Sequence, residues 1–134
     1  MIIVAIDETD FNKASSILDS LDSKKCMVKI GSIAFNSIGP DLIFYAAEKG
    51  FDIFLDLKLH DIPNTVKKSI QGLSSLPIKM LTVHTSGGID MMEAAMEAVA
   101  GTDIKVFGVT ALTSLNDEDT NNIYQRNASD HVNA

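Results

Sequence analysis

The sequence predicts an α/β protein with a parallel sheet, and among such folds it favours a (β/α)8 TIM barrel. Apolar runs of strand length alternate with segments whose apolar residues recur at helical spacing. Polar residues close the successive runs at intervals of about 30 residues, the interval expected of a barrel of about 250 residues with chemistry at several strand ends. No glycine-rich phosphate loop follows the first strand, which argues against an open doubly wound sheet.

The first two strand-helix units are defined by short apolar runs and by capping residues. We expect strands over residues 2–7 and 26–30, with Lys29 facing the same side as Met27. Asp10 is suited to cap a first helix with an apolar stripe. Gly39-Pro40 is expected to open the second helix, with the proline in its first turn, and Gly50 to end it.

The remaining units begin with the run from Phe51 to Leu59. Its apolar residues occupy both faces, as in a parallel strand that is covered on both sides. Pro63 suits the start of the next helix. Further strands are expected over residues 79–85 and 104–112, separated by a helix whose Met92/Met96 stripe we assign to the core and which Gly101 stops. The tail from Asn116 onward is weakly helical.

Composition limits the classes of function. A chain of 134 residues, 46% of them hydrophobic, can bury a single core. The net charge of -7 gives nucleic acid and anionic membranes no general electrostatic reason to bind, so neither is expected as a partner. Cys26 is the only cysteine, which excludes an intrachain disulfide and a cysteine-rich zinc site. A reducing, cytoplasmic setting is therefore the simplest interpretation.

Charged residues gather at the end of the third predicted strand. Alternation places Asp56 and Lys58 on one face, and Asp61 follows just beyond. Because buried charges are costly unless they are paired, such a set needs either mutual pairing or a function. The other predicted strands also end in polar residues, namely Asp7, Lys29, His84 and Thr113.

The segment DLKLHDIPNTV, residues 56–66, resembles the signature of the orotidine 5'-phosphate decarboxylases, carboxy-lyases that make UMP in pyrimidine biosynthesis. Other landmarks fit the resemblance, which covers essentially the whole chain: AID at residues 5–7, VKIG at 28–31, TVHTSGG at 82–88 and GVTALTS at 108–114. The D-x-K-x-x-D pattern is shared with related sugar-phosphate enzymes, so I-P-N-T after it and V-K-I-G before it carry the specificity.

The resemblance implies a role for each matching residue. Lys58 would be the proton donor, with Asp56 beside the scissile carboxylate and Lys29 completing the charged array. Asp61 would reach the site of a partner subunit, with Thr65 nearby, which implies a homodimer. The remaining substrate contacts would come from Asp7 at the ribose, from Ile62, and from Thr113 or Ser114 at the pyrimidine.

These roles agree with the chemistry of the reaction. Loss of CO2 leaves a poorly stabilised carbanion, so charge must be placed where it favours the transition state over the ground state. Two flanking lysines keep Asp56 ionised, and its repulsion of the substrate carboxylate eases as CO2 leaves. The scheme requires no cofactor and no metal.

Five strands cannot close an eight-stranded barrel, so residues 1–134 are expected to be the N-terminal portion of a single barrel domain, ending within a helix. An intact mass near 14.5 kDa for the soluble, monomeric natural product would refute this. Barrels commonly bind phosphate after strands 7 and 8, so this portion alone is expected to be inactive.

Two other functions stay open. One is a Mg²⁺-dependent sugar-phosphate enzyme such as a keto-gulonate-phosphate decarboxylase or hexulose-phosphate synthase, although Lys29 stands where those enzymes hold the ion with a glutamate. The other is a non-catalytic half-barrel that pairs with another chain. Single residues also have structural interpretations: His84 is expected in a supporting role as a hydrogen-bonded core histidine.

Overall fold

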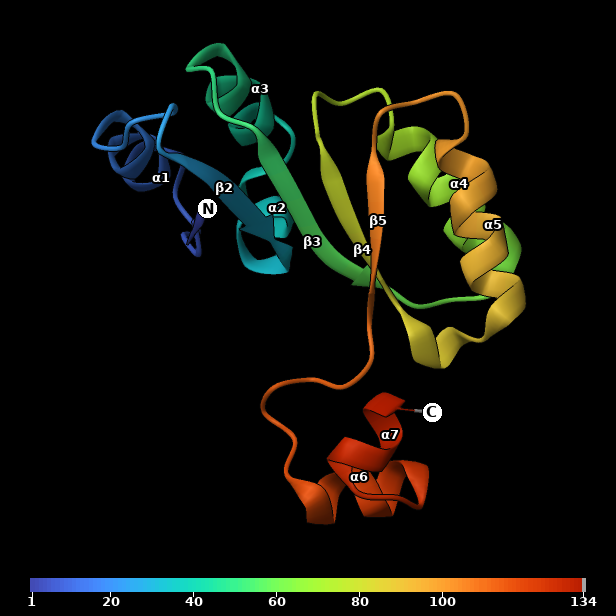
Figure 1. Ribbon diagram of the computed structural model, residues 1–134. Coiled ribbons are helices and arrows are strands. Elements are labelled where there is room, and N and C mark those ends of the chain that lie inside the picture. Colours follow the sequence, from blue (N-terminus) through green and yellow to red (C-terminus); the bar gives the residue numbers. More distant parts are fainter. Residues whose placement is uncertain (134) are drawn as a thin grey trace.

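The structure is a computed structural model that describes residues 1–133, and these form a parallel sheet with helices between the strands (Figure 1). Every neighbouring pair of strands is parallel, and the spatial order follows the sequence: β1 (Ile2–Ala5), β2 (Cys26–Gly31), β3 (Ile53–Leu59), β4 (Met80–His84) and β5 (Lys105–Val109). Each strand lies beside the one before it, as in a barrel wall, whereas the order of a doubly wound sheet reverses at a switch point. The predicted parallel sheet is therefore confirmed.

Helices α1 to α5 lie along one face of this sheet, while α6 and α7 lie beyond the carboxyl end of β5 (Figure 1). Asp10 caps the first helix as predicted, because its carboxylate accepts a hydrogen bond from the Lys13 amide at 3.0 Å. Within residues 1–133, no helix has the length and apolarity needed to cross a membrane. The helices are α1 (Phe11–Asp19), α2 (Ser32–Ile38), α3 (Asp41–Glu48), α4 (Pro63–Leu73), the short 3₁₀ helix η1 (Thr85–Gly87), α5 (Ile89–Val99), α6 (Asp117–Tyr124) and α7 (Ala128–Asn133).

Several observed boundaries differ from the predicted ones. Helix α2 was not predicted, and it ends at Gly39, whose φ of +85° lets the chain turn into α3. Pro40 consequently caps α3 instead of lying in its first turn. Strands β1 and β5 are both shorter than predicted. The last paired residue of β1 is Ala5, opposite Lys29 of β2, and that of β5 is Val109, opposite His84 of β4.

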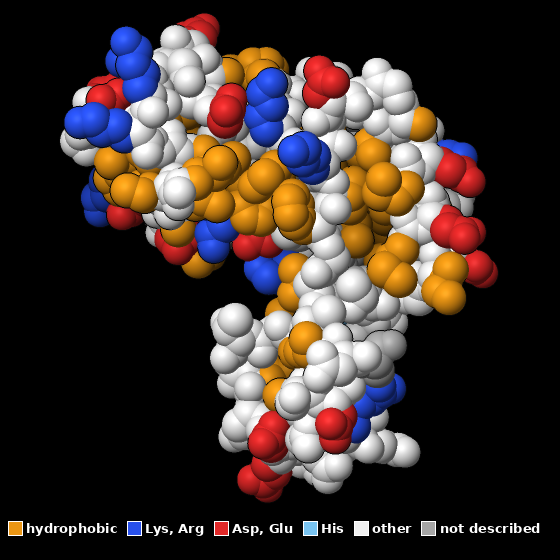
Figure 2. All heavy atoms as spheres, in the orientation of Figure 1, with side chains coloured by type: hydrophobic (Ala, Val, Ile, Leu, Met, Phe, Trp, Pro, Cys, Tyr) orange, Lys and Arg blue, Asp and Glu red, His pale blue; other side chains and the backbone are white. Residues whose placement is uncertain are grey.

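The core lies between the sheet and helices α1 to α5. Apolar strand residues that point toward these helices are fully buried, among them Val28, Ile30, Ile53 and Leu55. The other face of the sheet is only partly covered, because Ile3 and Phe107 there remain 44% and 47% exposed. Hydrophobic side chains form a band across this part of the molecule (Figure 2). Burial of apolar side chains on one face of the sheet therefore stabilises the fold, whereas the other face is partly exposed to solvent.

The assignment of the Met92/Met96 stripe to the core is wrong for Met96, whereas Met92 does pack against the core. Met96 is 56% exposed and Met92 only partly buried, whereas Met91 is fully buried. The buried face recurs from Met91 at helical spacing through Ala95, Ala98 and Val99. Met91, and not Met96, therefore supplies a large side chain to the buried face of α5.

Candidate active site

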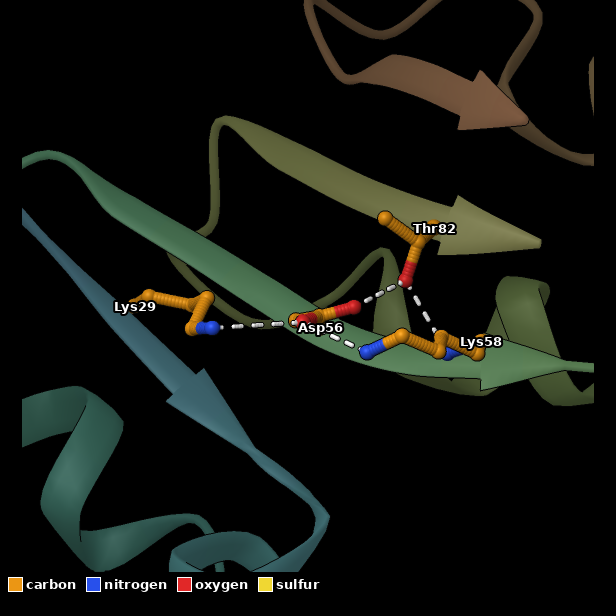
Figure 3. A network of polar contacts seen from close by, with 4 residues as sticks. All are labelled: Lys29, Asp56, Lys58 and Thr82. Carbon is orange, nitrogen blue, oxygen red and sulfur yellow. Dashed lines mark hydrogen bonds and ion pairs between the residues drawn. The ribbon is translucent and has the colours of Figure 1, made fainter. Parts of the chain in front are cut away.

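The structure brings Lys29, Asp56 and Lys58 together on the open face of the sheet (Figure 3). Lys58 Nζ lies 2.9 Å and Lys29 Nζ 3.6 Å from the same oxygen, Oδ2 of Asp56. The Asp56 side chain is only 9% exposed, while the two lysine side chains are 40% and 33% exposed. The fourth member of the network is Thr82, whose hydroxyl donates to Oδ1 of Asp56 at 2.7 Å.

Regular strand alternation does not account for the position of Lys58. Its φ is +48°, in the left-handed region that few residues other than glycine adopt. The pairing of β3 with β4 shifts register between Leu55 and Leu59, so the ladder is interrupted around this residue. The Lys58 side chain nevertheless returns toward Asp56, two residues earlier on the same strand.

The surroundings of Asp56 keep its carboxylate charged. Burial by itself would raise the pKa of Asp56, but hydrogen bonds from Lys58 and Thr82, together with the charges of Lys58 and Lys29, hold that pKa below its ordinary value. One carboxylate is therefore flanked by two ammonium groups, which leaves a local excess of positive charge. Such an array can receive an anionic ligand even though the chain as a whole is acidic.

A second group of predicted residues lies beyond the carboxyl end of β3. Asp61, Ile62 and Thr65 are all exposed, and the Ile62 amide donates to Asp61 Oδ1 at 2.7 Å. Asp61 and Ile62 also line a surface hollow between the ends of β3 and β4. Among residues 1–133, no hydrogen bond or ion pair links these three side chains to Asp56.

Three other predicted site residues lie apart from the charged network. Asp7 is exposed beyond the end of β1, and Thr113 and Ser114 are exposed in a turn that follows β5. In the described part of the chain, none of the three is hydrogen-bonded or ion-paired to Lys29, Asp56 or Lys58. Their common feature is that each follows the carboxyl end of a strand. In a parallel sheet these ends all lie at the same end of the strands.

His84, at the end of β4, is buried and hydrogen-bonded. Its Nδ1 accepts a hydrogen bond from the Ser86 amide at 3.1 Å, and its ring stacks on that of His60 with centroids 5.3 Å apart. Burial, followed by the nearby charges of His60, His131 and Lys58, lowers the pKa of His84. These surroundings favour the neutral form of the imidazole.

Sequence reasoning missed Thr82. The alternation of the fourth predicted strand does place Thr82 on one face with His84, and a hydroxyl on a buried strand needs a hydrogen-bond partner. That partner, Asp56, lies 26 residues away in the sequence, and nothing local identifies it. The motif TVHTSGG therefore indicates a buried hydroxyl at Thr82 but does not identify Asp56 as its hydrogen-bond partner.

Comparison with known proteins adds independent evidence. The model of the "Orotidine 5'-phosphate decarboxylase / HUMPS family" matches residues 1–134. Among curated proteins, the chain is 46% identical to an orotidine 5'-phosphate decarboxylase of Baumannia cicadellinicola over 88% of this chain and 49% of that protein. It is also 46% identical to an enzyme of the same name from Ehrlichia canis, over 98% of this chain and 58% of that protein.

Among solved structures, the orotidine 5'-phosphate decarboxylase of Lactobacillus acidophilus matches with a TM-score of 0.89 at 36% identity, over 98% of this chain and 62% of that one. The chain spans about half the length of the curated relatives that it matches. The five strand-helix units described here thus correspond to part of a TIM barrel. From the match over its full length, the chain belongs to the orotidine 5'-phosphate decarboxylase / HUMPS family.

Proposed function

We propose that the full natural gene product containing this chain decarboxylates orotidine 5'-monophosphate to UMP in pyrimidine biosynthesis, without a cofactor. The observation that carries this proposal is the array in which Lys29 and Lys58 hold one nearly buried carboxylate, Asp56. Names of relatives support the same activity: the proteins from Baumannia cicadellinicola and Ehrlichia canis are called orotidine 5'-phosphate decarboxylases.

In the proposed reaction, the bond between the pyrimidine ring and its carboxylate breaks, CO2 leaves, and the electron pair stays on the ring carbon. Lys58 then gives one ammonium proton to that carbon, and solvent returns a proton to the lysine. The ionised Asp56 repels the substrate carboxylate before the bond breaks and not afterwards. The cations of Lys58 and Lys29 stabilise the developing carbanion in a preorganised position.

We further propose that the outlying residues contact the substrate once the site is complete. Asp7 would hold the ribose, Thr113 or Ser114 would lie against the pyrimidine, and Ile62 would lie beside the base. Their exposure at the carboxyl edge of the sheet leaves them free to meet a ligand there. His84, which is buried and whose pKa is lowered, would support the site without touching the reacting atoms.

The test is loss of orotidine 5'-monophosphate, followed by its ultraviolet absorbance with EDTA present. We expect activity in the wild type and a fall in kcat of about 10²- to 10⁴-fold in Lys58→Ala. Lys79→Ala provides a matched control, because Lys79 is an exposed lysine just before β4 and outside the array. A wild type without activity would contradict the proposal.

We propose a homodimer in which Asp61 and Thr65 reach the partner's site. Both side chains are exposed and do not contact Asp56 of their own chain, which supports a role outside it. A mixture of Lys58→Ala and Asp61→Ala proteins tests this. After exchange of subunits, one site of each heterodimer carries both native residues, so about a quarter of wild-type activity should return. If Asp61 serves its own subunit, no activity returns.

The Mg²⁺-dependent sugar-phosphate function is disfavoured by one observation. Lys29 Nζ lies 3.6 Å from Asp56 Oδ2, so an ammonium group already faces the carboxylate that would attract a divalent ion. Loss of activity in EDTA, together with turnover of a sugar phosphate, would favour that function. The scaffold alternative predicts that UMP leaves the melting temperature unchanged, whereas a nucleotide site predicts a rise.

We also propose that residues 1–134 constitute the N-terminal part of one barrel domain and do not turn over by themselves. Barrel enzymes commonly bind phosphate after strands 7 and 8, and the chain described here carries the first five. Detectable decarboxylation by a verified polypeptide of residues 1–134 would refute this. The single cysteine, Cys26, supports a cytoplasmic setting for the protein.

A further inference from the structure

Thr82 makes two hydrogen bonds that meet at one hydroxyl (Figure 3). Its Oγ1 donates to Asp56 Oδ1 at 2.7 Å and accepts from the Lys58 amide at 2.9 Å. A hydroxyl has one proton to donate and lone pairs to accept with, so both bonds can form at once. Thr82 is 3% exposed, so water does not compete freely for either bond.

The bond to the Lys58 amide lies where the regular pairing of β3 with β4 is interrupted. The pairing of β3 with β4 shifts register around Lys58, so Thr82 supplies a side-chain acceptor in place of a regular ladder bond. Lys58 also has φ of +48°, a backbone conformation that is strained for residues other than glycine. Such a conformation persists only where its surroundings hold it, and Thr82 is one of the groups that do so.

The bond to Asp56 fixes the orientation of its carboxylate group. With Oδ1 bound by Thr82, the other oxygen, Oδ2, receives both Lys58 Nζ and Lys29 Nζ. Rotation of the carboxylate would break the Thr82 bond and turn Oδ2 away from the two ammonium groups. One hydroxyl from β4 therefore orients the anion and holds the backbone of the lysine that faces it.

We infer that Thr82 is a positioning residue for the proposed decarboxylation: it sets the placement of the Lys58 ammonium group and the Asp56 carboxylate relative to each other. This inference rests on the proposed function. Thr82 itself touches no reacting atom. Its effect is on kcat, because misplacement of a catalytic group by about 1 Å can lower a rate about 100-fold.

The experiment compares Thr82→Val and Thr82→Ser in the full natural gene product. Valine keeps the shape and removes the hydroxyl, and we expect kcat to fall about 10- to 100-fold with KM changed by less than about 3-fold. Serine keeps the hydroxyl, and we expect most of kcat to return. Thr85→Val is the matched control, since it removes another hydroxyl, which donates to the Val109 carbonyl at 3.1 Å, away from the array.

A second readout separates positioning from simple loss of stability. Without the Thr82 bond, the pKa of Asp56 rises, so the acidic limb of the kcat profile should move to higher pH in Thr82→Val and not in Thr85→Val. If Thr82→Val does not fold, Thr82→Cys makes the same comparison with serine, because a thiol is a weak donor.

The outcomes distinguish this inference from the proposed function. An inactive wild type contradicts the proposed function itself. An active wild type whose kcat is unchanged by Thr82→Val, or is reduced as much by Thr82→Ser as by Thr82→Val, overturns the positioning role and leaves the proposed function standing.

Discussion

Asp56 keeps a charge in a place where an unpaired charge would be costly. The carboxylate is nearly buried, but its three polar neighbours satisfy both oxygens. The lysines are partly exposed, so the ion pairs themselves contribute modestly, as pairs near solvent do. Removing one partner would cost more free energy than the ion pair itself contributes, because it would leave a buried group without its hydrogen bonds.

The pKa of Asp56 predicts how stability depends on pH. In the folded state it lies below its ordinary value of 3.8, so Asp56 contributes its full stability above that value and loses it as pH falls through the folded pKa. We expect Asp56→Asn to lower the free energy of unfolding by about 1–3 kcal/mol at neutral pH, and the difference from wild type to shrink below about pH 4.

Urea unfolding between about pH 7 and pH 2.5 measures this difference. Asp52→Asn is the control, because Asp52 is an exposed carboxylate just before the same strand. A difference for Asp56→Asn that persists unchanged at the acidic end would contradict the role of its charge.

The sequence allowed part of this site to be predicted. Charged residues in an apolar strand need a partner or a function, so the strand pattern alone singles out Asp56 and Lys58. Lys29 lies on a different strand and was identified through its position at a strand end and through the family resemblance. The left-handed backbone of Lys58 has no signal in the sequence, because residues that adopt that region are usually glycines.

At the scale of elements, strand centres were predictable and strand ends were not. The apolar runs define where a strand must be buried, but its last residue depends on how far its pairing with the neighbouring strand extends. Helix α2 spans seven residues, which is too short for helical periodicity to stand out. Helix α6 begins with a reciprocal capping box between Asn116 and Asp119, which explains how a weakly periodic segment forms a helix.

Two glycines provide a test of packing between elements. A Cβ added to Gly108 on β5 would lie 2.6 Å from Cγ2 of Thr85, and Thr85 is held there by its bond to the Val109 carbonyl. We expect Gly108→Ala to destabilise the protein by about 1–3 kcal/mol. Gly72, in helix α4, has open space around it, so Gly72→Ala should stabilise by about 0.5–1 kcal/mol.

Thermal unfolding of the two alanine variants checks both signs in one experiment. Equal and small changes in melting temperature would mean that Thr85 can shift at little cost to accommodate the added methyl group. Opposite signs would show that β5 is packed tightly against the carboxyl end of β4. The proposed site is built at this end of the strands.

At the scale of the whole molecule, the sheet has two edges within the described residues. β1 pairs only with β2, and β5 pairs only with β4. A closed barrel has no edges, whereas an open sheet presents unpaired amide and carbonyl groups that can pair with another chain. The open face beside these edges also carries apolar side chains, including the exposed Ile3 and Phe107.

These features predict that a polypeptide of residues 1–134, made alone, associates with itself. Its outer strands would pair with those of other copies, and association would bury the apolar band of the open face. The expected result is a weight-average mass in sedimentation equilibrium that rises with concentration above the 14.5 kDa of one chain. The double variant Ile3→Lys/Phe107→Lys should reduce this association, because lysine on an edge strand opposes pairing.

Ile33→Lys is a control for a single added lysine, since Ile33 is an exposed apolar residue on helix α2 and not on an edge strand. If edge pairing causes the association, this variant associates as the parent does. Equal effects of Ile33→Lys and the edge variant would mean that the added positive charge, rather than edge pairing, governs the behaviour. A mass that stays at one chain at all concentrations would show that the five-stranded sheet protects its own edges, and the need for further strands to close the barrel would then lose its physical basis.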